Sequence, residues 1–132
     1  MKRGRSTTTP TREESERIEK CKARGCIACR LWVEHPDCPP EFRIRFTHYS
    51  DDGLDLAADY HHLLSGGIRR GHMYGVALCA WHHRGVLDWG STGKHMQAFY
   101  GPSLARGSKA FHDTFGDDQA LLDKQAEILG ET

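Results

Sequence analysis

The chain lacks any long apolar run: nothing in its 132 residues approaches the ~18 consecutive apolar residues of a membrane span. Its polar N-terminus also lacks the apolar core of a signal peptide, so we expect a cytoplasmic protein with no membrane partner. Hydrophobic residues make up only 38% of the sequence, and small domains with so little core material often depend on a structural metal. Five cysteines is an odd number, and reducing conditions favour thiolate metal ligands over disulfides.

The formal net charge is zero, but positive and negative residues are concentrated in separate parts of the chain. Residues 1–30 and 61–110 each carry an excess of five positive charges, and residues 31–60 and 111–132 each carry an excess of five negative charges. The second basic block suits a phosphate-bearing substrate. Charge scattered only for solubility explains any one block equally well.

The order of sequence patterns predicts an α+β fold: one domain over residues 10–132 behind a basic flexible leader, residues 1–9. Thr11 and Glu14 have the spacing of a capping box before a helix at 12–24, which Gly25 ends. Period-two alternation predicts a strand at 42–47 after a proline-rich loop. The remaining expected elements are strands from about 54 to 61 and at 76–78, a loop at 65–71, a short helix from 81, and helices at 94–100, 108–115 and 118–129.

One stretch, residues 59–85, is unusually rich in histidine. It holds five of the nine histidines, one cysteine and three arginines around a glycine-rich loop. Two His-His pairs, His61-His62 and His82-His83, frame that loop. This composition indicates metal chemistry beside an anion.

Two chelating pairs predict a structural zinc ion. Cys26-x-x-Cys29 and Cys79-x-x-His82 each have the two-residue gap that directs both side chains at one ion. Together they form a Cys3His set, which in tetrahedral zinc sites is closed to water and structural. The alternative is that Cys26 and Cys29 are ordinary buried thiols. Cys21 and Cys38 have no partner at chelating spacing, and we expect packing or free thiols there.

Three further histidines suggest a second, catalytic site. Neighbouring strand residues point to opposite sides, so His61 and His62 should not both face one ion; one would bind metal and the other would activate water. His83 could supply a second ligand from the following helix. Taken singly, His35, His48, His95 and His112 fit structural or surface roles as well.

A strand ending in His-His, a glycine-rich loop and then Leu-Cys-x-x-His-His resembles the HNH, or ββα-metal, nuclease motif. The resemblance implies that His61 and His83 hold a divalent metal and that His62 is the general base. It implies Mg2+ or Mn2+ as the catalytic ion, with Zn2+ able to occupy that site, beside structural Zn2+.

Four blocks in order narrow the resemblance to the phage Ref family of recombination-enhancement, RecA-dependent nucleases. They are Gly-Cys-Ile-Ala-Cys-Arg (25–30), His-His-Leu-Leu-Ser-Gly-Gly-Ile-Arg-Arg-Gly-His (61–72), Leu-Cys-Ala-Trp-His-His-Arg-Gly (78–85) and Gly-Pro-Ser-Leu-Ala-Arg-Gly-Ser-Lys-Ala-Phe (101–111). The similarity spans roughly residues 10–130, with a poor match at 31–58. It implies an endonuclease that cuts DNA, directed by the RecA filament, in a phage-infected or bacterial cell.

The chain departs from the HNH pattern in two places. The middle asparagine would fall near Tyr74, yet the sequence contains no asparagine; His72 or a main-chain carbonyl could orient His62 instead. A third metal ligand would fall at Leu87, which cannot bind metal. The ion could have only two protein ligands and waters, or it could recruit Asp88, His95 or His112.

The resulting hypothesis is metal-assisted hydrolysis of a DNA phosphodiester, with His62 taking a proton from water. Arg69, Arg70 and Arg84 are candidates for phosphate contacts, because arginine pairs bidentately with phosphate. A non-catalytic zinc module that binds nucleic acid is the alternative, and the missing asparagine favours it. A zinc hydrolase of peptides or small molecules is disfavoured, since the chain has no His-Glu-x-x-His motif and a basic local field.

Overall fold

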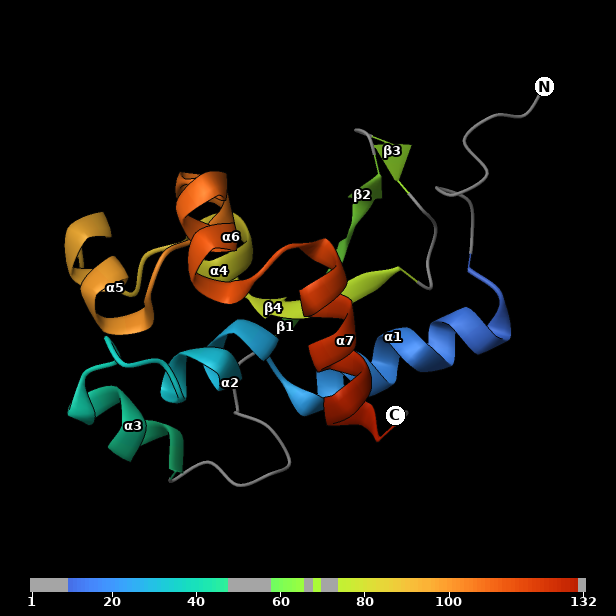
Figure 1. Ribbon diagram of the computed structural model, residues 1–132, viewed down its shortest axis with the longest axis horizontal. Helices are drawn as coiled ribbons and strands as arrows, with labels where there is room; N and C mark the ends of the chain where they lie inside the picture. Colours follow the sequence, from blue (N-terminus) through green and yellow to red (C-terminus); the bar gives the residue numbers. More distant parts are fainter. Residues whose placement is uncertain (1–9, 48–57, 66–67, 70–73, 131–132) are drawn as a thin grey trace.

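The computed structural model of the chain describes residues 10–47, 58–65, 68–69 and 74–130. The expected basic leader, residues 1–9, lies outside these ranges. The described chain contains helices around a small antiparallel sheet (Figure 1). The α+β class predicted from the sequence is therefore confirmed.

The first helix, α1 (Arg12–Arg24), follows its sequence signals closely. Thr11 caps it: the Glu14 backbone N–H donates to Thr11 Oγ1 at 3.1 Å, and the Glu14 carboxylate accepts from the Thr11 N–H at 2.8 Å. Gly25 ends the helix with a φ of 82°, a conformation that favours glycine. The predicted bounds and capping box are confirmed.

The next two helices were not predicted from the sequence. Cys26 is the N-cap of the first, α2 (Ile27–Val33). The segment expected to be a strand at 42–47 is the helix α3 (Pro40–Thr47). Proline is favoured in the first turn of a helix, and the alternating apolar residues do not share a face, because Phe42 is 3% exposed and Ile44 is 60% exposed.

The central sheet pairs β1 (Ala58–His62) with β4 (Gly75–Cys79) in antiparallel register, with Ala58 opposite Cys79 and His62 opposite Gly75. The expected strands over 54–61 and 76–78 correspond to these, although residues 54–57 lie outside the described chain. Part of the expected loop at 65–71 is instead a short ribbon of β2 (Leu64–Ser65) and β3 (Ile68–Arg69). It extends the hairpin beyond the sheet.

The described chain after β4 is helical, and the helices predicted at 94–100, 108–115 and 118–129 are confirmed. Its elements are α4 (Ala80–Arg84), α5 (Gly93–Tyr100), the 3-10 turn η2 (Leu104–Arg106), α6 (Ser108–Phe115) and α7 (Asp118–Leu129). Glycines follow α4, α5, α6 and α7 directly. No described helix has the length and apolar character needed to cross a membrane.

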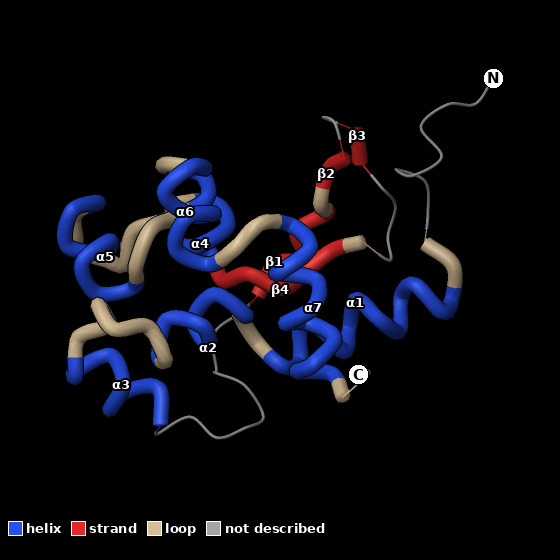
Figure 2. Tube along the Cα trace, in the orientation of Figure 1, coloured by secondary structure: helices blue, strands red, loops and turns tan. Residues whose placement is uncertain are grey.

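The sheet lies between two sets of helices (Figure 2). Helices α1, α2 and α7 contact it from one side, and α4 packs against the end of β4 and against β1. Strand β4 is buried along its whole length. The turn from β4 into α4 therefore carries Cys79 and His82 into the core, while His83 beside them is half-buried.

Candidate functional site

Three cysteines and one histidine meet in the core. Cys26 and Cys29 come from the start of α2, and Cys79 and His82 from the junction of β4 and α4. All four are buried, and their ligand atoms lie within 4.8 Å of one another. The structure therefore brings together the four residues that the two chelating pairs predicted.

The spacing of these atoms fits a tetrahedral ion. His82 Nδ1 lies 3.4 Å from Cys26 Sγ, 3.6 Å from Cys29 Sγ and 3.2 Å from Cys79 Sγ. Cys29 Sγ and Cys79 Sγ are 4.0 Å apart. Bond lengths typical of zinc give edges of about 3.8 Å between sulfurs and about 3.6 Å between sulfur and nitrogen. The four residues can therefore hold a metal ion such as zinc without rearrangement.

The surroundings of His82 orient its ring for this role. Its Nε2 lies 2.8 Å from the carbonyl oxygen of Tyr100, which can only accept, so Nε2 carries the proton and Nδ1 faces the sulfurs. A hydrogen bond of this kind on the far nitrogen is usual for metal-binding histidines. The ring also packs edge-on against Phe115, with centroids 5.4 Å apart.

The pKa values within the cluster diverge as expected for thiols that share protons. Hydrogen bonding to Cys26 and Cys29 lowers the pKa of Cys79 far below its usual range, while contacts with Cys26 and Cys79 raise that of Cys29. Burial would lower the pKa of His82, but interactions with Cys26 and Cys79 raise it to about 10. Together these shifts favour a deprotonated Cys79 beside a protonated His82. A bound cation would balance the negative charge of the sulfur in the same way.

A second group lies where β1 faces α4. The rings of His61 and His83 are 5.1 Å apart between centroids and tilted by 56°. Asp59, two residues before His61 and so on the same side of the strand, accepts from His83 Nδ1 at 2.9 Å and from Arg84 Nε at 2.7 Å. Both predicted ligands and one predicted phosphate contact are thus adjacent.

Asp59 was missed by the sequence reasoning. Burial raises its pKa, but the hydrogen bonds from His83 and Arg84 and their charges together lower it below the usual value. The available signal was the two-residue step from His61, which places both side chains on one face of a strand. That signal was weak because the sequence does not show that α4 packs against this face of β1.

His62 lies on the other side of β1. Its ring meets that of Tyr60 edge-on at 5.3 Å, two residues away along the strand. For Arg69 only the backbone, in β3, is described, and Arg70 and His72 lie outside the described residues.

Two of the three residues considered as a third ligand, Asp88 and His112, are engaged elsewhere. Asp88 accepts from the Tyr100 hydroxyl at 3.2 Å, and His112 Nδ1 donates to the Gly116 carbonyl at 2.9 Å. In the part of the chain that the structure describes, the buried Cys3His cluster is the one group of three or more His, Cys, Asp or Glu side chains placed to hold an ion. A metal at His61 and His83 would thus complete its coordination with water or substrate.

A two-stranded antiparallel hairpin, a short helix directly after it and a Cys3His metal cluster at their junction are consistent with a small ββα-metal core. The model of the family described as "Recombination enhancement, RecA-dependent nuclease" matches residues 10–130, and the chain belongs to this family. The resemblance to the Ref family is therefore confirmed, and with it a nuclease function in general terms. No curated protein and no solved structure matches the chain.

Proposed function

We propose that the protein is a metal-dependent, HNH-type endonuclease that hydrolyses DNA phosphodiester bonds and is directed by the RecA filament. The observation that carries this proposal is the pairing of His61 with His83 beside Asp59, at the turn that also carries Cys79 and His82. Family membership supports the nuclease class. The structural ion at the Cys3His cluster is Zn2+ under this proposal, since three thiolates suit zinc better than Mg2+ or Mn2+.

The histidine pair suits a second ion. Two imidazoles that bind one ion at about 2.1 Å have ring centroids about 5 Å apart, close to the 5.1 Å found. Because the Nδ1–H of His83 donates to Asp59, the lone pair of His83 Nε2 is left for a metal. When bound, Mg2+ or Mn2+ would stabilise the negative charge that develops on the phosphate and on the leaving oxygen.

The chain's own groups would supply proton transfer and phosphate binding. Of His61 and His62, His61 is the one whose ring meets His83, and His62 meets Tyr60 instead. This arrangement suits His62 as the general base, because a general base must not itself bind the ion. Neutral His62 would accept the proton of the attacking water. Arg84 uses its Nε for Asp59, so its two terminal nitrogens can donate to a phosphate. Arg69 and Arg70 remain proposed phosphate contacts of the glycine-rich loop.

The test is His62→Ala in a plasmid-nicking assay with Mg2+ or Mn2+ and a RecA–DNA filament. Nicking should be abolished, while DNA affinity and zinc content stay at wild-type levels because His62 is outside the Cys3His cluster. His35→Ala is the matched control, because His35 contacts Trp32 and Asp37 outside the histidine pair and the Cys3His cluster, and it should nick normally. Failure of the wild-type protein to cut under these conditions would overturn the nuclease proposal.

The second candidate is a non-catalytic zinc module that binds nucleic acid. The absence of asparagine from the chain favours it, because HNH nucleases normally use that residue to orient the base. Under this alternative, His62→Ala and wild type would bind DNA equally well and neither would cut it.

A further inference from the structure

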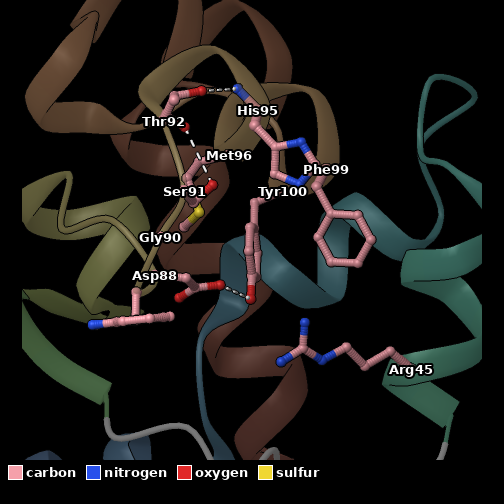
Figure 3. A pocket seen from close by; sticks show the side chains of 10 residues that line it. Arg45, Asp88, Gly90, Ser91, Thr92, His95, Met96, Phe99 and Tyr100 are labelled. Carbon is pink, nitrogen blue, oxygen red and sulfur yellow. Dashed lines mark hydrogen bonds between the residues drawn. The ribbon is translucent and has the colours of Figure 1, made fainter.

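A cavity of about 580 Å3 opens beside α5, away from the histidine pair, and no role has been assigned to it. It is bounded by α3, by α5 and by the α4–α5 loop, residues 85–92. Its lining combines the aromatic rings of Trp89, Phe99 and Tyr100 with the cation of Arg45. In Figure 3 the Arg45 guanidinium points toward the Tyr100 hydroxyl, whose hydrogen bond to Asp88 is drawn as a dashed line. The volume is in the range of small-ligand sites, roughly 300–1,000 Å3.

Trp89 stands at the tip of a tight turn and is 101% exposed. The Ser91 N–H donates to the Asp88 carbonyl at 3.0 Å, and Gly90 has a φ of 78°. Since no described residue other than glycine has a positive φ, this is the pattern of a type II turn, with glycine in the position that needs it. A tryptophan left wholly in water at such a tip offers a large apolar face to a ligand.

The loop that presents Trp89 is held at several points. Arg106 donates from Nε to the Gly85 carbonyl at 3.0 Å, and its guanidinium lies 5.5 Å from the Trp81 ring. A Cβ added at Gly93 would lie only 2.8 Å from the same guanidinium, so both ends of the loop contact Arg106. Tyr100 fixes Asp88 within the loop. A turn held in this way loses little conformational entropy when a ligand binds.

The cavity lining holds one cation, Arg45, and one acid, Asp88, whose carboxylate is hydrogen-bonded to Tyr100. The sequence block that contains the loop, residues 61–110, is basic, with six Lys and Arg residues and one acid, which suits a polyanion. Arg45 lies 5.9 Å from the centroid of the Phe99 ring, with its guanidinium over that ring. Aromatic faces combined with a cation are the recurring means by which proteins bind single-stranded nucleic acid, through base stacking and phosphate contact.

We propose that this cavity is a nucleobase subsite that takes one unpaired base of a DNA strand, with Trp89 as the stacking platform and Arg45 contacting the backbone phosphate. The inference rests on the proposed function for its substrate, DNA. The α4–α5 loop begins directly after His83 and Arg84, so one short segment of chain joins α4 to the cavity. The Tyr100 main chain, which accepts from His82, ties the cavity wall to the metal cluster.

Intrinsic fluorescence tests the subsite directly. Trp32 and Trp81 are 4% and 3% exposed, so quenching by an added oligonucleotide reports Trp89. Zinc-loaded full chain, without Mg2+ or Mn2+, is titrated with a short oligothymidylate and with duplex of the same length. We expect quenching by the single strand and weak quenching by the duplex. Because Trp89 variants lack this reporter, the anisotropy of a dye-labelled oligothymidylate measures their affinity. Trp89→Ala should lose about 5- to 100-fold in single-strand affinity, while Trp89→Phe keeps most of it.

Two control variants complete the design. Leu87→Ala removes an exposed side chain of the same loop that does not line the cavity, and it should bind as wild type does. Arg45→Gln should reduce the slope of log affinity against log salt by roughly 0.7, whereas Arg12→Gln, on exposed α1, should not. Equal affinity of wild type and Trp89→Ala for the single strand would overturn the proposal.

The possible outcomes distinguish a failure of the base subsite from a failure of the proposed nuclease function. Single-strand quenching by a wild-type protein that never nicks DNA would support the subsite and count against the nuclease. Normal nicking with unchanged single-strand affinity in Trp89→Ala would do the reverse. Loss of RecA-filament binding in Trp89→Ala, with single-strand affinity intact, would replace the base subsite with a protein-docking surface.

Discussion

Asp59 joins two side chains of α4 through one carboxylate oxygen. It accepts from His83 Nδ1 at 2.9 Å and from Arg84 Nε at 2.7 Å. A carboxylate behind a histidine fixes the ring's tautomer and orientation for a metal on the other nitrogen. The same oxygen directs the remaining nitrogens of Arg84. Under the proposed function, Asp59 would therefore act through its neighbours as a positioning residue.

Asp59→Ala should weaken Mn2+ binding at His61 and His83 by about 10- to 100-fold, since outer carboxylates of this kind contribute that much to metal affinity. Titration calorimetry on zinc-loaded protein measures it. Asp59→Asn should lose less, because an amide oxygen can still accept from His83. Asp113→Ala, which removes an exposed partner of Lys109, is the control. Wild-type Mn2+ affinity in Asp59→Ala would show that Asp59 does not orient His83.

The candidate site could be predicted where its residues lie close together in the sequence. Cys26, Cys29, Cys79 and His82 could be assigned because two residues between ligands is a constraint that an ion itself imposes. Asp59 could not be assigned, because its role depends on where α4 packs against β1. Tyr100, whose carbonyl accepts from His82, contributes a backbone atom, which side-chain identity does not reveal.

Among the elements, α1 shows how much a helix cap can determine. Thr11 and Glu14 satisfy each other's backbone N–H, and α1 covers the side of β1 that carries Tyr60. Thr11→Ala should lower the free energy of unfolding by about 0.5–2 kcal/mol, the usual cost of removing such a cap. Chemical denaturation measures it, with Ser15→Ala as the control at an exposed position of α1. A loss as large in Ser15→Ala would mean that the cap is not responsible.

Helices with caps and glycine stops were predictable, and α3 was not. The alternation of Phe42, Ile44 and Phe46 has the two-residue period that is typical of a strand. The segment is nevertheless a helix. What decided the outcome was the pair of prolines at its start and the packing of Phe42 edge-on against Phe99 and Tyr100, at 5.4 Å each. Such packing is tertiary and overrides local pattern.

At the scale of the whole molecule, the Cys3His cluster joins the N-terminal helices to the β4–α4 turn. Cys26→Ser should lower metal content by about one ion per chain and leave the domain largely unfolded. Structural zinc contributes about 10–16 kcal/mol, comparable to the whole stability of a domain. Serine still caps α2 well, so loss of the cap cannot account for the effect. Metal analysis and thermal unfolding are the measurements.

Cys38→Ser is the matched control, because Cys38 is buried but stands outside the cluster. It should keep the full metal content. A strong chelator should lower the melting temperature of wild type toward that of Cys26→Ser. Unchanged metal stoichiometry in Cys26→Ser would refute the cluster as an ion site.

An ion at this cluster would also close 49 residues, 30–78, into a ring between Cys29 and Cys79. The entropy lost on closing a ring grows only with the logarithm of its length, about 0.6 kcal/mol for each doubling. Lengthening this stretch between the elements would therefore cost little stability. Residues 31–58, where the sequence predicted a poor match to the Ref family, lie within the ring. We therefore expect the four ligands to tolerate a change of length there.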